Sequence, residues 1–457
     1  MPTKPIVKKL TGNSINILNA IRNGATEDYR NYVPTALNDG TNLREIGAVL
    51  TEFPNLKNEF INSLVNRIGK VILTSKLYDN PIAFLKKGFL EYGETIEEIF
   101  VALAEPHTYD MEVAENEVFK REIPDVRTQF HTLNYQKFYK ATITEQNIKL
   151  AFLSMDGVTN LIAGIVDALY TSAHYDEFLT MKYLIAVALN KGFIKVANIP
   201  TVTNENMKTV TAKIKGLSNN LTFESTSYNL AGVPTYTDKS NQYLLVNSVF
   251  DAIMDVEVLA SAFNMGKAEF LGHKVLIDSF GNLDIPRLNK LFKNDPNYYQ
   301  FSQDELDVLN NIPAIVLDEN WFMMFDNLDE FTENYNGQGL YWNYFYHVWK
   351  TFSFSMFSNA VAFVEGTSAV NSVDVVPSAV TASIGQSVQL SANVETVNFA
   401  PRSVNWNSDT EGVTITPSGL VIIDNQDELK GKSVVITATS TYDVSKKGTS
   451  TLTIAND

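Results

Sequence analysis

The pattern of residue types changes near residue 366, and this change constrains the fold more than any other feature of the sequence. Residues up to Phe363 are rich in aromatic side chains and Asn, and they mix helical with strand-like periodicities. Beyond the change, Val, Ser and Thr dominate and aromatic residues become rare. The sequence therefore predicts a mixed α+β part over 1–365 and a small all-β part over 373–457. The mostly small and polar residues 366–372 are predicted to form a flexible linker between them.

The C-terminal part consists of short strand patterns. Residues 387–394 and 403–408 alternate polar and apolar side chains, which indicates half-buried strands. Trp406 is predicted to face the interior. The turn at 417–419 places Gly419 where a positive φ is expected. Strands at this spacing, with turns between them, predict a β-sandwich.

A long helical pattern runs through the middle of the larger part. Apolar residues recur at helical spacing, and neither Pro nor Gly interrupts the chain between Gly164 and Gly192. The pattern predicts one helix over about 156–191, roughly 45 Å long at the usual rise per residue, with Gly192 as its C-terminal cap. The helix would divide, if anywhere, at the triplet 174–176.

Upstream of this helix, the sequence predicts an extended arm. Two strand candidates, 95–103 and 136–144, are separated by a charged stretch of poor periodicity at 114–127. They predict a two-stranded excursion over about 84–143 with little core of its own. Because such a ribbon is only marginally stable alone, we expect it to rest on a neighbouring molecule.

Shorter patterns complete the larger part. A short amphipathic helix is predicted to end at Gly69, and Ser302 opens the capping box of another. Residues 195–245 are rich in Asn and Thr, which predicts loops or edge strands. The segment 340–364 predicts a strand, with clear alternation over 352–358.

The composition excludes several classes of protein. Lys and Arg number 36 against 52 Asp and Glu, for a net charge of −16, which argues against an electrostatic grip on nucleic acid. The absence of cysteine removes disulfide scaffolds, Cys-ligated metals and thiol nucleophiles, and it is compatible with assembly in a reducing compartment. No run of 18 apolar residues and no signal-peptide pattern is present, so neither a membrane helix nor export is expected.

The sequence offers no catalytic, cofactor-binding or metal-binding constellation. Nucleotide-binding loops, hydrolase elbows and zinc-protease motifs are missing. The histidines are scattered without ligand spacing: His107, His131, His174, His273 and His347. Asp251 and Asp255 would share a helix face but Glu257 would not, which favours a solvated helix start over a divalent-ion site. Glu97 and Glu98 would point to opposite faces of a strand, so they are not an acid/base pair.

The C-terminal part resembles a known module. VTASIGQSVQLSANV, VNWNSD, VTITPSGLV and VVITATSTYD are similar, in order and spacing, to the bacterial immunoglobulin-like group 2 domain. That resemblance implies a binding or spacer module without catalysis, with Trp406 buried between its sheets.

The larger part resembles a phage protein family. GLYWNYFYHVWKTFSFSMFSNAVAFV at 339–364 is similar to the major capsid protein of small, short-tailed, phi-29-type bacteriophages. Other similar segments follow the same order, among them FINSLVNRIG at 60–69, NPIAFLKKG at 80–88, VFKREIPDVRTQFH at 118–131 and DENWFMMFDNL at 318–328. From its residues alone, the aromatic block inside 339–364 is interpreted as packing or a subunit interface rather than as a surface that stacks sugars or bases.

The resemblance implies the Hong Kong 97-type capsid fold within a shell domain of residues 1–365. Its parts would be an N-terminal arm (about 1–45), an E-loop (about 84–143), a spine helix (about 156–191), an axial region (about 193–320) and a peripheral strand (about 340–364). The E-loop would lie on the next subunit. Lys86, Lys87, Glu97 and Glu98 are predicted subunit-contact residues.

The resemblance also implies the function. The chain would be a structural protein, not an enzyme, and would form hexamers and pentamers of an icosahedral head around double-stranded DNA. Its partners would be copies of itself, a scaffolding protein and portal during assembly, and packaged DNA through non-specific contact. The immunoglobulin-like domain would lie on the outer surface, available to a head fibre or host surface. No cofactor or membrane is expected, and the protein would be found in the host cytoplasm during assembly and then in the virion.

A second class of function remains open: an adhesin or receptor binder that uses the immunoglobulin-like domain. An adhesin would need an export signal or wall anchor, and no such pattern is recognisable. A receptor binder would not need a long helix and an extended arm. The capsid interpretation is therefore preferred.

Overall fold

The computed structural model describes residues 14–74, 80–91, 95–104, 106–107, 125–153, 157–254 and 273–456. The chain forms two compact units. Unit 1 comprises Met1–Ile96, His131–Thr180 and Met324–Phe352, and unit 2 comprises Glu97–Phe130, Met181–Met323 and Ser353–Asp457.

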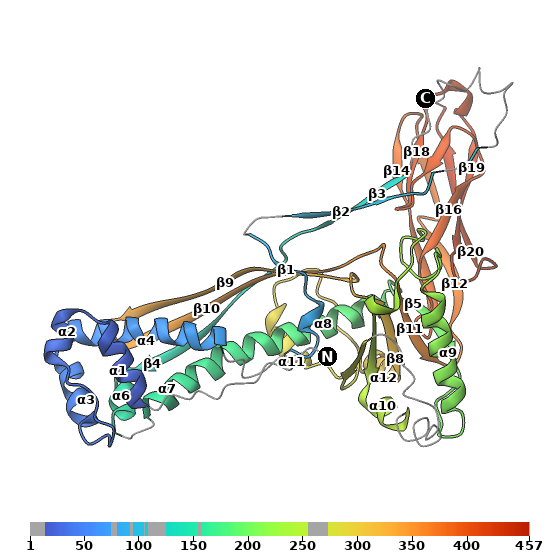
Figure 1. The fold of residues 1–457 in the computed structure, drawn as a ribbon. Helices are drawn as coiled ribbons and strands as arrows, with labels where there is room; N and C mark the ends of the chain where they lie inside the picture. The colour runs from blue at the N-terminus through green and yellow to red at the C-terminus, as the bar shows by residue number, and fades with distance from the viewer. Residues whose placement is uncertain are drawn as a thin grey trace. The chain divides into compact units, whose positions relative to one another are not determined.

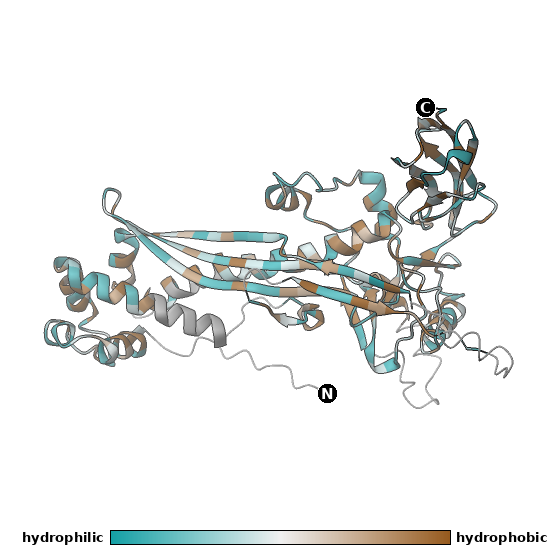
Figure 2. Cartoon of the chain, turned by 90° about the horizontal axis from the view of Figure 1, so that it is seen from above, coloured by the Kyte–Doolittle hydropathy of each residue, from teal (hydrophilic) through white to brown (hydrophobic). Residues whose placement is uncertain are grey.

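Unit 1 is built on a four-stranded sheet. Its order is β1 (Gly88–Phe89), β9 (Phe322–Asn336), β10 (Tyr341–Phe354) and β4 (Tyr135–Thr144). β1 runs parallel to β9, and β10 runs antiparallel to β4. Along β10, buried residues alternate with partly exposed ones, so one face of the sheet meets the core and the other does not. Figure 2 shows bands of hydrophilic and hydrophobic residues along the long strands of this sheet.

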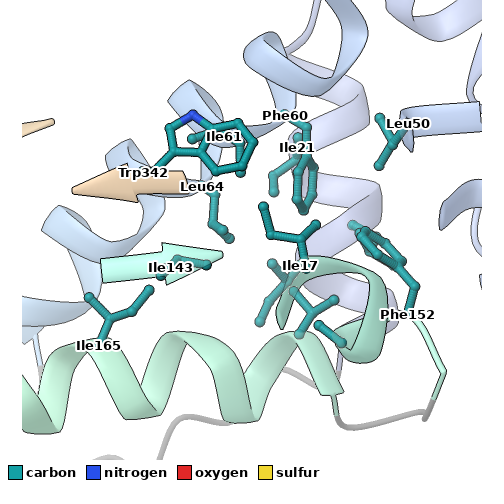
Figure 3. Packing of buried hydrophobic residues seen from close by; sticks show 14 of the residues in the cluster. Ile17, Ile21, Leu50, Phe60, Ile61, Leu64, Ile143, Phe152, Ile165 and Trp342 are labelled. Carbon is teal, nitrogen blue, oxygen red and sulfur yellow. The ribbon is translucent and has the colours of Figure 1, made fainter. Parts of the chain in front are cut away.

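Helices cover the buried face of this sheet. They are α1 (Ser14–Gly24), α2 (Glu27–Tyr32), α3 (Leu43–Glu52), α4 (Pro54–Thr74), α6 (Glu145–Ala151) and α7 (Gly157–Val166), with a single 3-10 turn at Ala83–Leu85 (Figure 1). Ile17 of α1 and Phe60 of α4 converge with Trp342 of β10 in one apolar core (Figure 3). Residues 14–45 of the predicted N-terminal arm thus contribute helices to this core. The helix predicted to end at Gly69 continues to Thr74, because an isolated glycine costs a helix only about 1 kcal/mol.

The predicted long helix is present but interrupted. α7 is followed by a π-helical turn, Asp167–Thr171, and then by α8 (Ser172–Asn190). The turn lies just before the triplet at 174–176, where the sequence pattern weakens. Gly192 ends the helix at a φ of 72°, as predicted for its C-terminal glycine.

The predicted arm exists with a different second strand. β2 (Ile96–Val101) pairs with β3 (Val126–His131) in a separate two-stranded sheet. The predicted strand at 136–144 is β4, which instead pairs with β10 over ten residue pairs. The prediction of its partner was wrong because a period of two specifies a strand but not its neighbour. Most of the stretch at 114–127 lies outside the described residues.

Unit 2 contains a five-stranded mixed sheet. Its order is β5 (Lys195–Ile199), β11 (Ala360–Glu365), β8 (Ala314–Asp318), β6 (Gln242–Asn247) and β7 (His273–Ile277). Its helices are α9 (Met207–Asn220), α10 (Ser248–Met254), α11 (Ile285–Leu291) and α12 (Gln303–Asn310), with a 3-10 turn at Lys239–Asn241. Ser302 caps α12 through the predicted capping box.

Two predictions for this region were wrong. Residues 195–245 contain the helix α9. Its Asn and Thr residues have low helix propensity, so the helical spacing of the buried Met207, Val210 and Ile214 was overlooked. The single strand predicted over 340–364 is two strands, β10 and β11, in different sheets. The break follows Ser355, because its hydroxyl accepts hydrogen bonds from the backbone N–H groups of Phe357 and Ser358, both at 3.1 Å, and turns the chain.

The C-terminal part is a β-sandwich with its own apolar core. Its strands are β12 (Ala369–Val376), β13 (Ala379–Ala382), β14 (Ser387–Gln389), β15 (Ser391–Val397), β16 (Val404–Ser408), β17 (Val413–Ile415), β18 (Leu420–Ile423), β19 (Ser433–Ser440) and β20 (Lys447–Ile454), with a 3-10 turn at Asp427–Leu429. Gly419 has the expected positive φ of 85°. Trp406 is half-buried rather than fully buried, and packs against the edge of the core.

The predicted linker is shorter than expected. β12 begins at Ala369, so only residues 366–368 separate it from β11. Ser368 is buried, and its hydroxyl donates to the side-chain oxygen of Asn198, at 2.7 Å. These contacts replace much of the flexibility that the small, polar composition suggested.

Candidate assembly interface

The outer face of the β2–β3 hairpin exposes a group of apolar side chains. Alternate residues of each strand share a face, and the more exposed face carries several apolar side chains together with Glu97 and Thr128. Its members, with their exposed fractions, are Ile99 (57%), Val101 (55%), Leu103 (66%), Val126 (52%) and Phe130 (60%). We call these five residues the outer apolar face. Such a concentration of exposed apolar side chains marks an interaction surface.

The opposite face of the hairpin is fastened to the turn after β10. The Gln129 side chain donates to the carbonyl of Phe354 and accepts from the N–H of Met356, both at 2.8 Å. The Ser355 hydroxyl donates to Glu98 at 2.7 Å. Phe100 stacks on Phe357, with ring centroids 5.8 Å apart. One face of the hairpin is therefore held within the protomer, while its outer apolar face remains exposed and available to a partner.

A second exposed surface lies on the face of the unit 1 sheet that turns away from the core. Phe138 of β4 is 59% exposed, and its ring lies 5.9 Å from that of Phe345 and 5.8 Å from that of His347. Lys140 is exposed on the same face and lies 5.7 Å from the Phe345 ring centroid. We call these four residues the aromatic sheet face.

Unit 1 also contains a network of charged side chains. The ammonium of Lys86 lies 3.0 Å from Glu177 Oε2 and 2.6 Å from Asp326 Oδ2. Lys350 Nζ bonds to the same two carboxylates. Asn80 donates to the other oxygen of Glu177 at 2.8 Å. The buried Glu177 and the half-buried Asp326 thus each face two cations, which offsets the cost of burying the charge of Glu177.

The electrostatics of this network follow from burial and pairing. Burial alone would raise the pKa of Glu177, but the charges of Lys350 and Lys86 outweigh it and lower that pKa to about 2. Burial would lower the pKa of Lys350, yet Glu177 and Asp326 raise it above its ordinary value. Glu177 and Lys350 are therefore both charged at neutral pH.

The four predicted subunit-contact residues have different surroundings. Lys86 is engaged inside unit 1, and Glu98 lies on the fastened face of the hairpin. Glu97 is exposed on the other face, beside the outer apolar face. Lys87 is half-buried, and its backbone N–H donates to Met324. A contact between subunits through these residues stays a prediction, and Glu97 has the exposure that it requires.

Of the acidic candidates from the sequence, Asp251 lies in an ordinary ion pair. Asp251 pairs with Lys274 at 2.7 Å, while Asp255 and Glu257 lie outside the described residues. Among the residues with described positions, no group of three or more His, Asp or Glu side chains could hold a metal ion. Within that same part of the chain, no helix is long and apolar enough to cross a membrane.

Sequence reasoning missed the outer apolar face. The odd-numbered positions from 99 to 103 are all apolar, which was a usable signal, but Phe100 on the other face obscured the alternation. The aromatic block at 341–349 was expected to be packing or an interface. Its even-numbered residues are in the core, and Phe345 and His347 belong to the aromatic sheet face.

The fold has a counterpart among solved structures. The structure matches one described as the capsid structure of Staphylococcus phage Andhra, with a TM-score of 0.50 and 16% sequence identity, covering 65% of this chain and 86% of that one. The expected capsid fold of the Hong Kong 97 type is thereby confirmed.

Sequence comparison identifies the family. Residues 18–364 match the family described as Phi29-like phage major capsid protein. Major capsid proteins of Bacillus phages B103 and PZA are 36% and 35% identical, covering 90% and 91% of this chain and 87% and 88% of theirs. The chain belongs to the Phi29-like phage major capsid proteins, and its function is that of a major capsid protein of a tailed phage.

Proposed function

We propose that copies of this chain form the hexamers and pentamers of an icosahedral head around double-stranded DNA, and that the β2–β3 hairpin links neighbouring copies. The observation that carries the proposal is the outer apolar face, five side chains that are each more than half exposed. An edge hairpin with such a face is an aggregation hazard unless a specific partner covers it. A second copy is the partner always present when a shell is built.

The aromatic sheet face of the second copy is the surface that fits. It offers rings for the apolar side chains, and aromatic residues are enriched in interface cores. Charge also fits at the margin, because Glu97 is exposed beside the outer apolar face and Lys140 is exposed beside Phe345. Contact of one face with a different face is heterologous, and repetition of such a contact gives a ring when the rotation between copies closes, as a capsomer requires.

A weak individual contact suits a shell. Full burial of an aliphatic or aromatic side chain yields about 1.5–3 kcal/mol, so five half-exposed ones yield roughly 5 kcal/mol. That sum is at the lower end of the cost of association, about 4–15 kcal/mol. A single pair of copies is therefore expected to form and separate readily, whereas a closed shell gains the contact once for every subunit.

The remaining parts of the function rest on charge and on family resemblance. The net charge of −16 disfavours tight binding of DNA to the shell, because like charges repel. Contact with DNA would therefore be non-specific, and the genome would stay mobile while it enters. We infer a structural role without catalysis, assembly in the host cytoplasm, and use of a scaffolding protein and a portal. No cofactor is proposed.

We infer that the β-sandwich is an immunoglobulin-like module on the outer surface of the head. Its resemblance to group 2 domains and its separate core support this assignment. The family match ends at residue 364, just before the sandwich begins. The module would be available to a head fibre or a host surface.

Paired cysteines test the contact between copies directly, because the natural chain contains none. Ile99→Cys with Phe138→Cys places one thiol on each proposed surface, and each single variant is the matched control. Treatment of assembled protein with a flexible bismaleimide should give a ladder of multimers only for the double variant. Equal crosslinking of the double and single variants would contradict the proposed pairing of the two faces.

A further inference from the structure

The segment that leads into the hairpin is held to unit 1 by few backbone contacts. Residues 86–90 precede β2 in the chain, after the buried residues Asn80, Ile82 and Leu85, and their strand β1 is only two residues long. The N–H groups of Lys87 and Leu90 donate to the carbonyls of Met324 and Asp326, each at 2.8 Å. So short a strand contributes little stability by itself.

Lys86 adds ion pairs between this segment and the helix and sheet of unit 1. Its ammonium bonds to Glu177 on α8 and to Asp326 on β9. Lys350 of β10 bonds to the same two carboxylates from within the sheet. The exposed fraction of the side chain is 17% for Lys86, 10% for Lys350 and 1% for Glu177.

The two lysines differ in what their loss leaves behind. If the segment with Lys86 moves away, both carboxylates keep Lys350, and Glu177 also keeps Asn80. Lys86 itself moves toward water, where its charge is readily solvated. Loss of Lys350 instead removes the cation supplied by the sheet, and leaves a polar gap in the interior of the unit. Lys86 then remains on both carboxylates, but the lost cation is the more buried of the two, and removal of a buried partner is costly.

We propose that the ion pairs of Lys86 hold this segment to unit 1 reversibly, and we call this attachment the latch. The segment 86–90 has a bound state fastened through Glu177 and Asp326, and a released state in which Lys350 keeps the carboxylates neutralised. Lys86 is thus a positioning residue that fixes the root of the hairpin, rather than a residue of the contact between subunits. The benefit for assembly rests on the proposed function. Release would let the start of the hairpin shift while the core of unit 1 stays intact.

Amide hydrogen exchange on the full, unassembled chain tests the latch. Lys86→Met removes the charge and keeps the length of the side chain, and Lys87→Met is the matched control at the next position. Lys86→Met should speed exchange at the amides of Lys87 and Leu90 at least tenfold, with a melting temperature within about 2 °C of the parent. Lys86→Arg should restore slow exchange, and Lys350→Met should lower the melting temperature.

Several results would overturn the proposal. Exchange in residues 86–90 could be unchanged in Lys86→Met, or equally fast in Lys87→Met. Lys86→Met could also lower the melting temperature as much as Lys350→Met, which would make Lys86 an ordinary part of the folded core. Because the measurement needs no contact between copies, its outcome is independent of whether the hairpin docks on a neighbour.

Discussion

The outer apolar face predicts how strongly assembly depends on the hairpin. In the variant Ile99→Ser with Val101→Ser, two aliphatic side chains that are 57% and 55% exposed become polar. Each would bury its remaining surface on docking, which is about half of a full side-chain burial. At about 1.5–3 kcal/mol for full burial, the pair contributes roughly 2 kcal/mol to the contact.

This energy translates into an assembly threshold. Every subunit gives one hairpin and receives one, so a shell contains one such contact for each subunit. A loss of about 2 kcal/mol per subunit raises the critical concentration for assembly roughly 30-fold. Light scattering over a concentration series measures this threshold. The melting temperature of the unassembled chain should change little, because both side chains are on the surface.

The matched control is Val444→Ser, since Val444 is 70% exposed in the sandwich and lies outside both proposed surfaces. Its assembly threshold should equal that of the parent. If the hairpin variant assembled at the parental concentration, or if Val444→Ser had the same effect, the outer apolar face would not be the contact between copies.

Three further outcomes are expected. Lys350→Met should destabilise unit 1 by up to about 3–5 kcal/mol in urea unfolding, because the buried Glu177 loses one of its two cations, and an unchanged midpoint would refute this. The folded-state pKa of Glu177 is about 2 against an ordinary value of 4.5, so its stabilisation is present above pH 4.5 and is lost as the pH falls towards 2. Glu177→Gln should therefore flatten the pH dependence of the melting temperature in that range. Deletion of 366–457 should leave shell assembly possible, and loss of every particle in electron micrographs would overturn the modular arrangement.

The sequence predicted the elements of the fold better than their pairing. Periodicity identified the strand at 136–144 and the long helix, because both depend on local spacing. It did not show that β4 pairs with β10 while β2 pairs with β3, because register is decided by which buried faces meet. Nor did it show the break at Ser355. There the Ser355 hydroxyl accepts from two backbone N–H groups and ends the strand, although the polar–apolar alternation of the sequence continues beyond it.

The candidate site was less accessible to sequence reasoning. Lys86 was selected as a charged residue near an extended arm, yet its partner Glu177 lies 91 residues away along the chain, and Lys350 lies 173 residues from that same carboxylate. No local pattern links residues so far apart. The exposed side of the hairpin depends on which face is fastened to the turn after β10, and Gln129 and Glu98 carry no signal of that role in the sequence.

Electron microscopy of the purified full-length protein, expressed alone and together with the scaffolding protein of its phage, tests the central claim most directly. The account predicts closed shells or capsomer rings, with the outer apolar face of each hairpin covered by another copy. A protein that stays monomeric under both conditions, or shells in which Ile99, Val101 and Phe130 face solvent, would contradict it.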